Sequence, residues 1–310
     1  MKRIRAMLVA ACALTPVWLL ISPVEAQGIP QNIPRKELVI LENPEGTIKN
    51  AGWFNIWAIN AGSQSNGLQQ VALDTLWYID PEKGLEGAWD NSLAADKPLY
   101  NADFTEMRVK LRPGIFWSDG VEFTSADVKA TVDIQIKNPA MRFSAVLANN
   151  VASVETPDAQ TAIFKLKKPN SRFHANFTVR WGGIWILPKH VFEKVEDPLK
   201  FDFNKPVSLG AYTLHSYDPD GKWYIWQRRE DWQRTTLGRF GEPAPRYLAY
   251  IDPGPPDKRV IAQLNHELDV VHDIAPEEIL ARFAFAAPRP IGPRASSPSV
   301  GETPALHTHE

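Results

Sequence analysis

The chain has 310 residues, of which 34 are lysine or arginine and 36 are aspartate or glutamate, so its formal net charge is -2. This balance provides neither a basic footprint for nucleic acid nor an attraction to an anionic membrane, so neither is an expected partner. A chain of this length can bury one large or two moderate hydrophobic cores. We therefore expect a globular protein whose partner is a small solute or another protein.

The first 26 residues have the pattern of a secretory signal peptide. Basic residues are followed by an apolar run over residues 6–21, and Val24-Glu25-Ala26 places small residues at the two positions that signal peptidase recognises. The run is shorter than the ~20 residues that span a bilayer and contains Pro16, which disfavours a membrane anchor. We predict a cleaved signal over residues 1–26 and a periplasmic location.

The single cysteine, Cys12, lies inside this predicted signal. Residues 9–12 resemble a lipoprotein cleavage box only faintly, and the apolar core continues well past Cys12, which argues against lipidation. Without Cys12 the mature chain has no thiol. Disulfides, a cysteine nucleophile and a cysteine-ligated metal are therefore excluded.

The first predicted element after the signal is a strand. Residues 37–41 form a short continuous apolar run, typical of a strand covered on both faces. A segment rich in glycine, asparagine and serine follows over residues 51–67, and residues 68–78 predict a helix.

The stretch over residues 104–133 combines strands, turns and a helix. Apolar and basic residues alternate over residues 107–111, which is the pattern of a half-buried strand. Arg112-Pro113-Gly114 predicts a turn, and residues 115–117 predict a second short strand. Asp119-Gly120 then favours the positive φ angles of a tight turn.

A capped helix follows these turns. Thr124 occupies an N-cap position, and Asp127 lies three residues later at the spacing of a capping box. Val128 and Val132 recur at helical spacing, so a helix is predicted to begin at Ser125.

Later in the chain, turn-forming residues and apolar runs indicate further elements. They are hairpins over residues 151–166 and 207–229, a strand passing into a helix over residues 182–190, and a helix-to-strand crossing over residues 260–273.

The order of these elements resembles the family 5 extracellular solute-binding proteins, which are the oligopeptide, dipeptide and nickel receptors of ABC importers. The residues that carry the resemblance are Lys110-Leu111-Arg112, Gly114, Trp117-Ser118-Asp119-Gly120, Phe123-Thr124 and Asp127-Val128. Two later segments, Ile186-Leu187-Pro188-Lys189-His190 and Gly210-Ala211-Tyr212, also resemble the family's pattern.

The resemblance implies an α/β fold of the periplasmic binding protein-like type II class, in the large peptide-receptor group, with mixed sheets covered by helices. Residues 27–282 then form the first lobe and the start of the crossing to a second lobe. A small hairpin-rich subdomain is expected over about residues 80–185 of that lobe. The second lobe is expected to be largely missing.

Residues 283–310 differ in composition from the rest of the chain. They are rich in proline, alanine, arginine, serine and glycine and have no hydrophobic period. Such a segment buries too little apolar area to offset the entropy cost of ordering, so we expect disorder. The abrupt change also suggests a reading-frame change. A genuine short variant with a proline-rich tail is the alternative.

The resemblance implies the periplasmic substrate-binding component of an ABC importer, which binds peptides or a similar small oligomer and delivers them to permease subunits. A single lobe would bind weakly, because it leaves one face of the ligand in water. It would also expose apolar surface where further parts pack. The alternatives are an oligosaccharide receptor of the same family, a secreted hydrolase, and a chaperone-like role for an isolated lobe.

Neither catalysis nor a cofactor is predicted. Hydrolase and phosphate-loop motifs are absent from the sequence, and His266-Glu267 does not continue as a zinc-binding helix because position 270 is Val270. The family is typically monomeric.

In the resembled family the loop after the first strand lines the ligand cleft, which makes Trp53, Asn55 and Trp57 candidate substrate-binding residues. An indole face can stack on a ligand, and a carboxamide both donates and accepts hydrogen bonds. Trp181, beside the Ile-x-Pro-Lys-His segment, is the fourth candidate. Packing in the lobe core is the alternative for the tryptophans.

Overall fold

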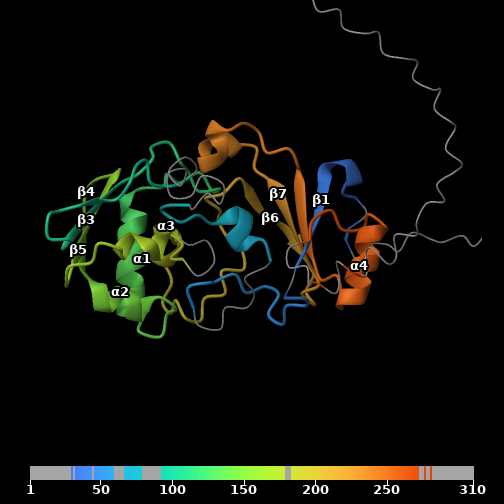
Figure 1. Ribbon diagram of the computed structural model, residues 1–310, viewed down its shortest axis with the longest axis horizontal. Coiled ribbons are helices and arrows are strands. Elements are labelled where there is room, and N and C mark those ends of the chain that lie inside the picture. Colours follow the sequence, from blue (N-terminus) through green and yellow to red (C-terminus); the bar gives the residue numbers. More distant parts are fainter. Residues whose placement is uncertain are drawn as a thin grey trace, which may run out of the picture.

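The structure is a computed structural model that describes residues 29–30, 32–43, 45–58, 66–78, 92–178, 183–271, 276 and 280. Two four-stranded sheets lie toward opposite ends of an elongated molecule (Figure 1). A continuous hydrophobic core joins them. It includes fully buried tryptophans at positions 57, 77, 117, 185 and 226.

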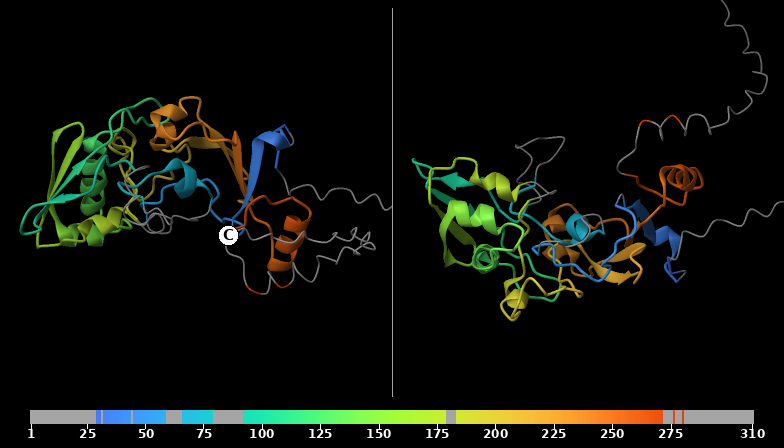
Figure 2. Two further views of the ribbon diagram at one scale, coloured as in Figure 1. Left: turned by 45° about the horizontal axis from the view of Figure 1, so that its top comes forward. Right: turned by 90° about the horizontal axis from the view of Figure 1, so that it is seen from below.

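The first sheet is antiparallel and has the order β2-β3-β5-β4. Its strands are β2 (Leu99–Tyr100), β3 (Glu106–Lys110), β4 (Val151–Asp158) and β5 (Thr161–Leu166). Helices α1 (Ser125–Lys137) and α2 (Ser144–Asn150) lie beside this sheet in both views of Figure 2. The predicted strand at 107–111 and the hairpin at 151–166 are confirmed.

The second sheet is mixed and has the order β1-β8-β7-β6. Its strands are β1 (Leu38–Glu42), β6 (Tyr212–Tyr217), β7 (Trp223–Arg228) and β8 (Tyr247–Ile251). Strand β1 pairs in parallel with β8, while β8 with β7 and β7 with β6 are antiparallel. Leu38 and Ile40 pack in a smaller core cluster, and Val39 and Leu41 pack against the larger one. Strand β1 is therefore covered on both faces, as its sequence predicts.

Helix α3 (Lys189–Phe192) follows Pro188, and helix α4 (Pro256–Leu264) follows β8. Short 3-10 helices occupy Arg35–Glu37, Phe173–Phe177, Trp232–Arg234 and Thr236–Arg239. No helix in the described ranges is both long enough and apolar enough to cross a bilayer.

The helix predicted over residues 68–78 is wrong beyond its first turn. Only Leu68–Ala72 is helical, as a single π-helical turn. The next residues are extended because their backbone groups bond to distant segments: the Leu76 carbonyl accepts from Ala94 N at 2.9 Å, and Trp77 N donates to the Phe177 carbonyl at 3.2 Å. The side chains of Leu76 and Trp77 are fully buried.

Two predicted strands are also absent. Residues 115–117 form only an isolated bridge, between Phe116 and Glu122, and residues 183–188 have no strand pairing. The tight turn itself is present, with Gly120 at φ 86°. Asp119 does not share that positive φ, so only the glycine carries the left-handed conformation.

The capping box at the start of α1 is confirmed. The Thr124 hydroxyl accepts from Ala126 N at 3.3 Å, and the Asp127 carboxylate accepts from Thr124 N at 2.9 Å. These contacts satisfy two backbone donors around the helix start. Helix α1 then buries Val128 and Val132 in the core.

Replacing Thr124 by alanine is expected to lower the free energy of unfolding by about 1 kcal/mol, because a cap hydrogen bond is lost. Thr124→Ser retains the hydroxyl and serves as the matched control, which should stay close to the parent. Urea denaturation followed by circular dichroism measures both. Equal losses for the two variants would contradict a capping role.

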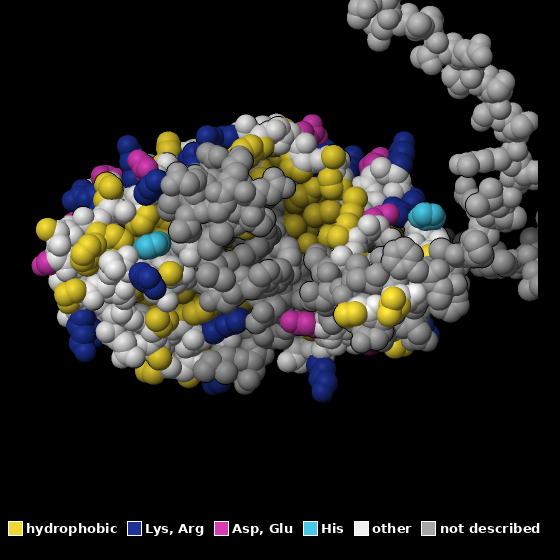
Figure 3. Space-filling view, in the orientation of Figure 1, with side chains coloured by type: hydrophobic (Ala, Val, Ile, Leu, Met, Phe, Trp, Pro, Cys, Tyr) yellow, Lys and Arg dark blue, Asp and Glu magenta, His cyan; other side chains and the backbone are white. Residues whose placement is uncertain are grey.

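Apolar surface is exposed around the second sheet. Hydrophobic side chains gather over this sheet in the space-filling view (Figure 3). Helix α4 adds Ile261 and Leu264, which are 49% and 43% exposed.

Candidate ligand-binding surface

The segment after β1 is fixed to the segment around residues 198–202. Phe54 N and Asn55 N both donate to the Asp202 carbonyl, at 2.7 and 3.2 Å. The Asn55 side-chain amide donates to the carbonyls of Pro198 and Phe201, both at 2.8 Å. Its Oδ1 accepts from the backbone N–H groups of two following residues. The fully buried Asn55 carboxamide thus uses its hydrogen bonds inside the protein.

Trp57 lies in the core of the same region. It is fully buried, and its Nε1 donates to the Trp185 carbonyl at 2.9 Å. Its ring packs edge-to-face on Phe192 and Phe203, with centroids 5.1 and 5.9 Å apart. These contacts give the indole a structural role in this chain.

Trp53 is placed differently from its neighbours. Its ring is partly exposed, and its Nε1 donates to the Asn55 carbonyl at 3.2 Å. Trp181 lies outside the described residues. The structure therefore brings Asn55 and Trp57 together in the interior and leaves the Trp53 ring accessible.

A pocket of about 550 Å³ lies against the edge strand β6, close to this segment. It is lined by Asn204, Lys205, Pro206 and residues 214–217 of β6. In the described part of the chain, no strand pairs with the outer edge of β6. The register shifts between Leu214 and Ser216, which marks a β-bulge beside the pocket.

Gly52, in the segment that carries Trp53, lies against the pocket residue Tyr217. A Cβ atom added at Gly52 would lie 2.8 Å from the Tyr217 hydroxyl oxygen, so a larger residue at this position would require the Tyr217 side chain to shift. Phe54 packs edge-to-face on the Tyr217 ring at 5.7 Å. Tyr217 is a pocket residue, and it links the edge strand to the loop.

The pocket offers hydrogen-bonding groups and a cation to a ligand. Lys205 and His215 are exposed, and His215 Nδ1 lies 3.0 Å from the Ser216 hydroxyl. Such groups suit a polar oligomer that combines carbonyl or hydroxyl groups with a negative charge. The sequence analysis did not find these residues. Their only signal is the mixed polar and apolar pattern of an edge strand.

The motif residues that resemble the family meet at a different place, and they form a structural junction. Asp127 accepts from Thr124 N and from Lys189 N, at 2.9 and 3.0 Å, which joins the start of α1 to α3. Burial raises the pKa of Asp127, and these two backbone donors oppose that shift. The His190 ring lies 2.7 Å from the Asp119 carboxylate and connects α3 to the glycine turn.

The described residues contain no cluster of three or more side chains suited to hold a metal ion. The β6 edge itself offers hydrogen-bonding groups, aromatic surface and the cation of Lys205.

Comparison with known proteins identifies relatives over much of the chain. The family of bacterial extracellular solute-binding proteins, family 5 (Middle), matches residues 90–298, a range that extends into the segment predicted to be disordered. The glutathione-binding protein GsiB of Shigella boydii is 35% identical over 144 residues, which are 46% of this chain and 26% of that protein.

Solved structures share the fold at lower identity. The mannohexaose-bound periplasmic oligopeptide-binding protein of Thermotoga maritima superimposes with a TM-score of 0.67 at 22% identity, over 82% of this chain and 44% of that one. AppA of Bacillus subtilis, solved with a nonapeptide, gives 0.62 at 18% identity, over 80% and 46%.

The chain thus spans less than half the length of the relatives it matches. The fold prediction is confirmed by these structures, and the resemblance of the 104–133 stretch is confirmed by the family match. The chain belongs to the bacterial extracellular solute-binding proteins of family 5.

Proposed function

We propose that this chain is a non-enzymatic substrate-binding receptor of an ABC importer, exported by residues 1–26 to the periplasm, where it presents a peptide to permease subunits. The observation that carries the proposal is the family match over residues 90–298. The likeness to a glutathione-binding protein supports a peptide as the ligand class, because glutathione is itself a short peptide.

The β6 edge supplies a physical route to peptide binding. An extended peptide can hydrogen-bond along an unpaired strand edge, and neighbouring pockets then select its side chains. Lys205 can attract a peptide carboxylate, and Tyr217 offers aromatic surface in the same pocket. We assign the partly exposed Trp53 to the same surface, because the neighbouring Gly52 lies against Tyr217. Of the four residues predicted from sequence, we retain Trp53 as a ligand contact, and we assign Asn55 and Trp57 to holding the loop.

Binding by this chain alone is expected to be weak. The β6 pocket is open to solvent on its outer side, so a ligand keeps part of its surface in water. Complete ligand sites bury roughly 70–90% of the ligand surface. Association also costs translational and rotational entropy whatever the contact area, so a partly covered ligand binds weakly.

Isothermal titration of the mature protein with glutathione, trialanine and mannohexaose tests this proposal. Saturable binding of a peptide, with none of mannohexaose, is the expected result. Preference for mannohexaose would favour the oligosaccharide alternative. Hydrolysis of the peptides during the titration would contradict a purely binding role.

Replacing Trp53 by alanine should weaken peptide binding by about three- to tenfold, because an aromatic contact is worth roughly 0.5–1.5 kcal/mol. Phe240→Ala is the matched control, since Phe240 is 59% exposed and does not line the pocket. Calorimetry of both variants with the same peptide gives the comparison. Equal affinities of the two variants for the peptide would show that Trp53 does not contact the ligand.

A further inference from the structure

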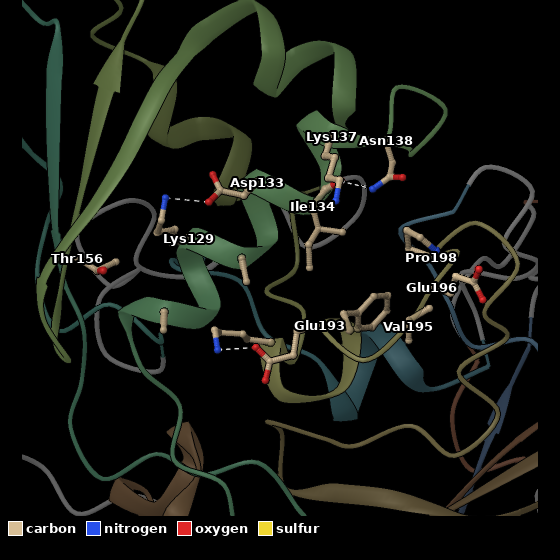
Figure 4. A pocket seen from close by; sticks show the side chains of 14 residues that line it. Lys129, Asp133, Ile134, Lys137, Asn138, Thr156, Glu193, Val195, Glu196 and Pro198 are labelled. Atoms are coloured by element: carbon tan, nitrogen blue, oxygen red, sulfur yellow. Dashed lines mark hydrogen bonds and ion pairs between the residues drawn. The ribbon is translucent and has the colours of Figure 1, made fainter.

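A second hollow lies away from the β6 edge, between α1 and the segment that contains α3. It has a volume of about 530 Å³, within the range of small-molecule sites. One wall is the outer face of α1, where Ala126 and Ala130 lie one turn apart and leave room for a ligand. Val195 supplies apolar surface from the opposite wall (Figure 4), and Phe192 also lines the groove.

Four of the charged side chains around this groove neutralise one another. Lys129 Nζ lies 2.8 Å from the Asp133 carboxylate on α1, and Lys189 Nζ lies 2.6 Å from the Glu193 carboxylate on the other wall. Each pair is spaced by four residues on its own helix or helical turn. These charges are already matched without a ligand.

Two charges at one end of the groove are not matched in this way. Lys137 ends α1, and Glu196 follows α3, so the cation and the anion come from opposite walls. Figure 4 shows both at the same end of the groove. Within the described chain neither side chain forms an ion pair or a hydrogen bond.

From this arrangement we infer that the groove binds a small zwitterion with an apolar middle, such as an aliphatic dipeptide. Its carboxylate pairs with Lys137, its ammonium pairs with Glu196, and its side chains cover Ile134 and Val195. The charge pattern complements a zwitterion better than a simple cation or anion, because each single charge would leave one rim residue unmatched. The site is formed by this chain alone and does not depend on the β6 pocket.

The test is a titration of the mature protein with leucyl-leucine, followed by NMR of backbone amides. Saturable shifts centred on Ala130 and Val195 are expected, whether or not the amides of residues 214–217 also shift. Shifts centred on the β6 edge, or no saturable shift, would overturn the groove site. The first of those outcomes would instead support the proposed peptide function.

Matched probes and variants then test the two charges separately. Acetylating the dipeptide amine should weaken binding by about two- to fivefold in the parent protein and have no effect in Glu196→Gln. Amidating the dipeptide carboxylate should likewise weaken binding to the parent protein and have no effect on binding to Lys137→Gln. Glu122→Gln and Lys110→Gln change exposed charges outside the groove and should retain the parent response to both probes.

Filling the groove provides an independent check. Ala130→Leu keeps a strong helix former on α1 but occupies the space between the walls, so it should abolish the dipeptide shifts. An unchanged circular dichroism spectrum would show that the fold is intact. Full binding by folded Ala130→Leu, or equal responses of the charge variants and their controls, would overturn the inference.

Discussion

Replacing Trp57 by alanine is expected to lower the free energy of unfolding by about 3–5 kcal/mol, the range for deleting a large buried aromatic side chain. The indole is fully buried, contacts Phe192 and Phe203, and donates to the Trp185 carbonyl. Globular domains have only about 5–15 kcal/mol in total, so much of the variant could unfold. Urea denaturation at constant temperature measures the loss.

Two further variants separate packing from ligand contact at this loop. Trp57→Phe keeps most of the ring volume and should lose only about 1–2 kcal/mol, chiefly from the unpaired Trp185 carbonyl. Trp53→Ala should lose less stability than Trp57→Ala, because its ring is already partly exposed. A stable Trp57→Ala that has lost peptide affinity would show that Trp57 is a ligand contact after all.

The contrast between Trp53 and Trp57 shows where the sequence stops being informative. Both residues lie in one polar loop with similar neighbours, and the sequence admits a core or a cleft role for each. Their positions depend on Asn55, which bonds to carbonyls 143 and 146 residues further along the chain. Such long-range contacts leave no local pattern to find.

Local chemistry was predicted more accurately. The capping box depends on two residues three positions apart, and it forms as expected at Thr124 and Asp127. The glycine turns also form, because Gly114 and Gly120 supply positive φ angles that other residues adopt at a cost. The buried strand β1 was visible as a continuous apolar run.

The failed helix prediction at residues 68–78 has a physical cause. An apolar pattern shows that side chains are buried, and it does not fix which backbone partners they have. Here residues 73–78 cross the core, and backbone and side-chain groups of other segments take the place of the helical hydrogen bonds. The β6 pocket was missed for a similar reason. It combines Lys205, from the segment before β6, with His215, which lies at a β-bulge that no spacing rule predicts.

The second large effect on stability is expected from substitution of the buried Arg229. Arg229 has 2% of its side chain exposed and forms a double hydrogen bond with the Asp231 carboxylate, both at 2.8 Å. Its guanidinium also donates to the carbonyls of Phe116 and Ser208, at 3.0 and 3.1 Å. This single side chain thus joins the end of β7 to the aromatic turn of the family motif.

Arg229→Met is expected to lower the free energy of unfolding by about 3–5 kcal/mol, because it leaves buried carbonyls without a donor and Asp231 without its partner. The double variant Arg229→Met with Asp231→Asn should lose less than the sum of the single variants. Arg246→Met is the control. That arginine is 48% exposed, its two ion pairs are long at 3.9 and 4.0 Å, and its guanidinium lies 5.8 Å from the Tyr247 ring centroid, so its loss should be within about 0.5 kcal/mol.

The same pair predicts a dependence on pH. Hydrogen bonding and the charge of Arg229 hold the pKa of Asp231 below its ordinary value. A lowered folded-state pKa stabilises the protein above the unfolded value of roughly 3.9, and this contribution is lost as the pH falls through the folded pKa. Stability should therefore decrease below about pH 4 less steeply in Arg229→Met than in the parent. If stability depends on pH identically in the two proteins, the pair does not link folding to the protonation of Asp231. A shallower dependence in Arg229→Met, together with its large loss of stability at pH 7, would identify Arg229 as the residue that holds the motif turn in place.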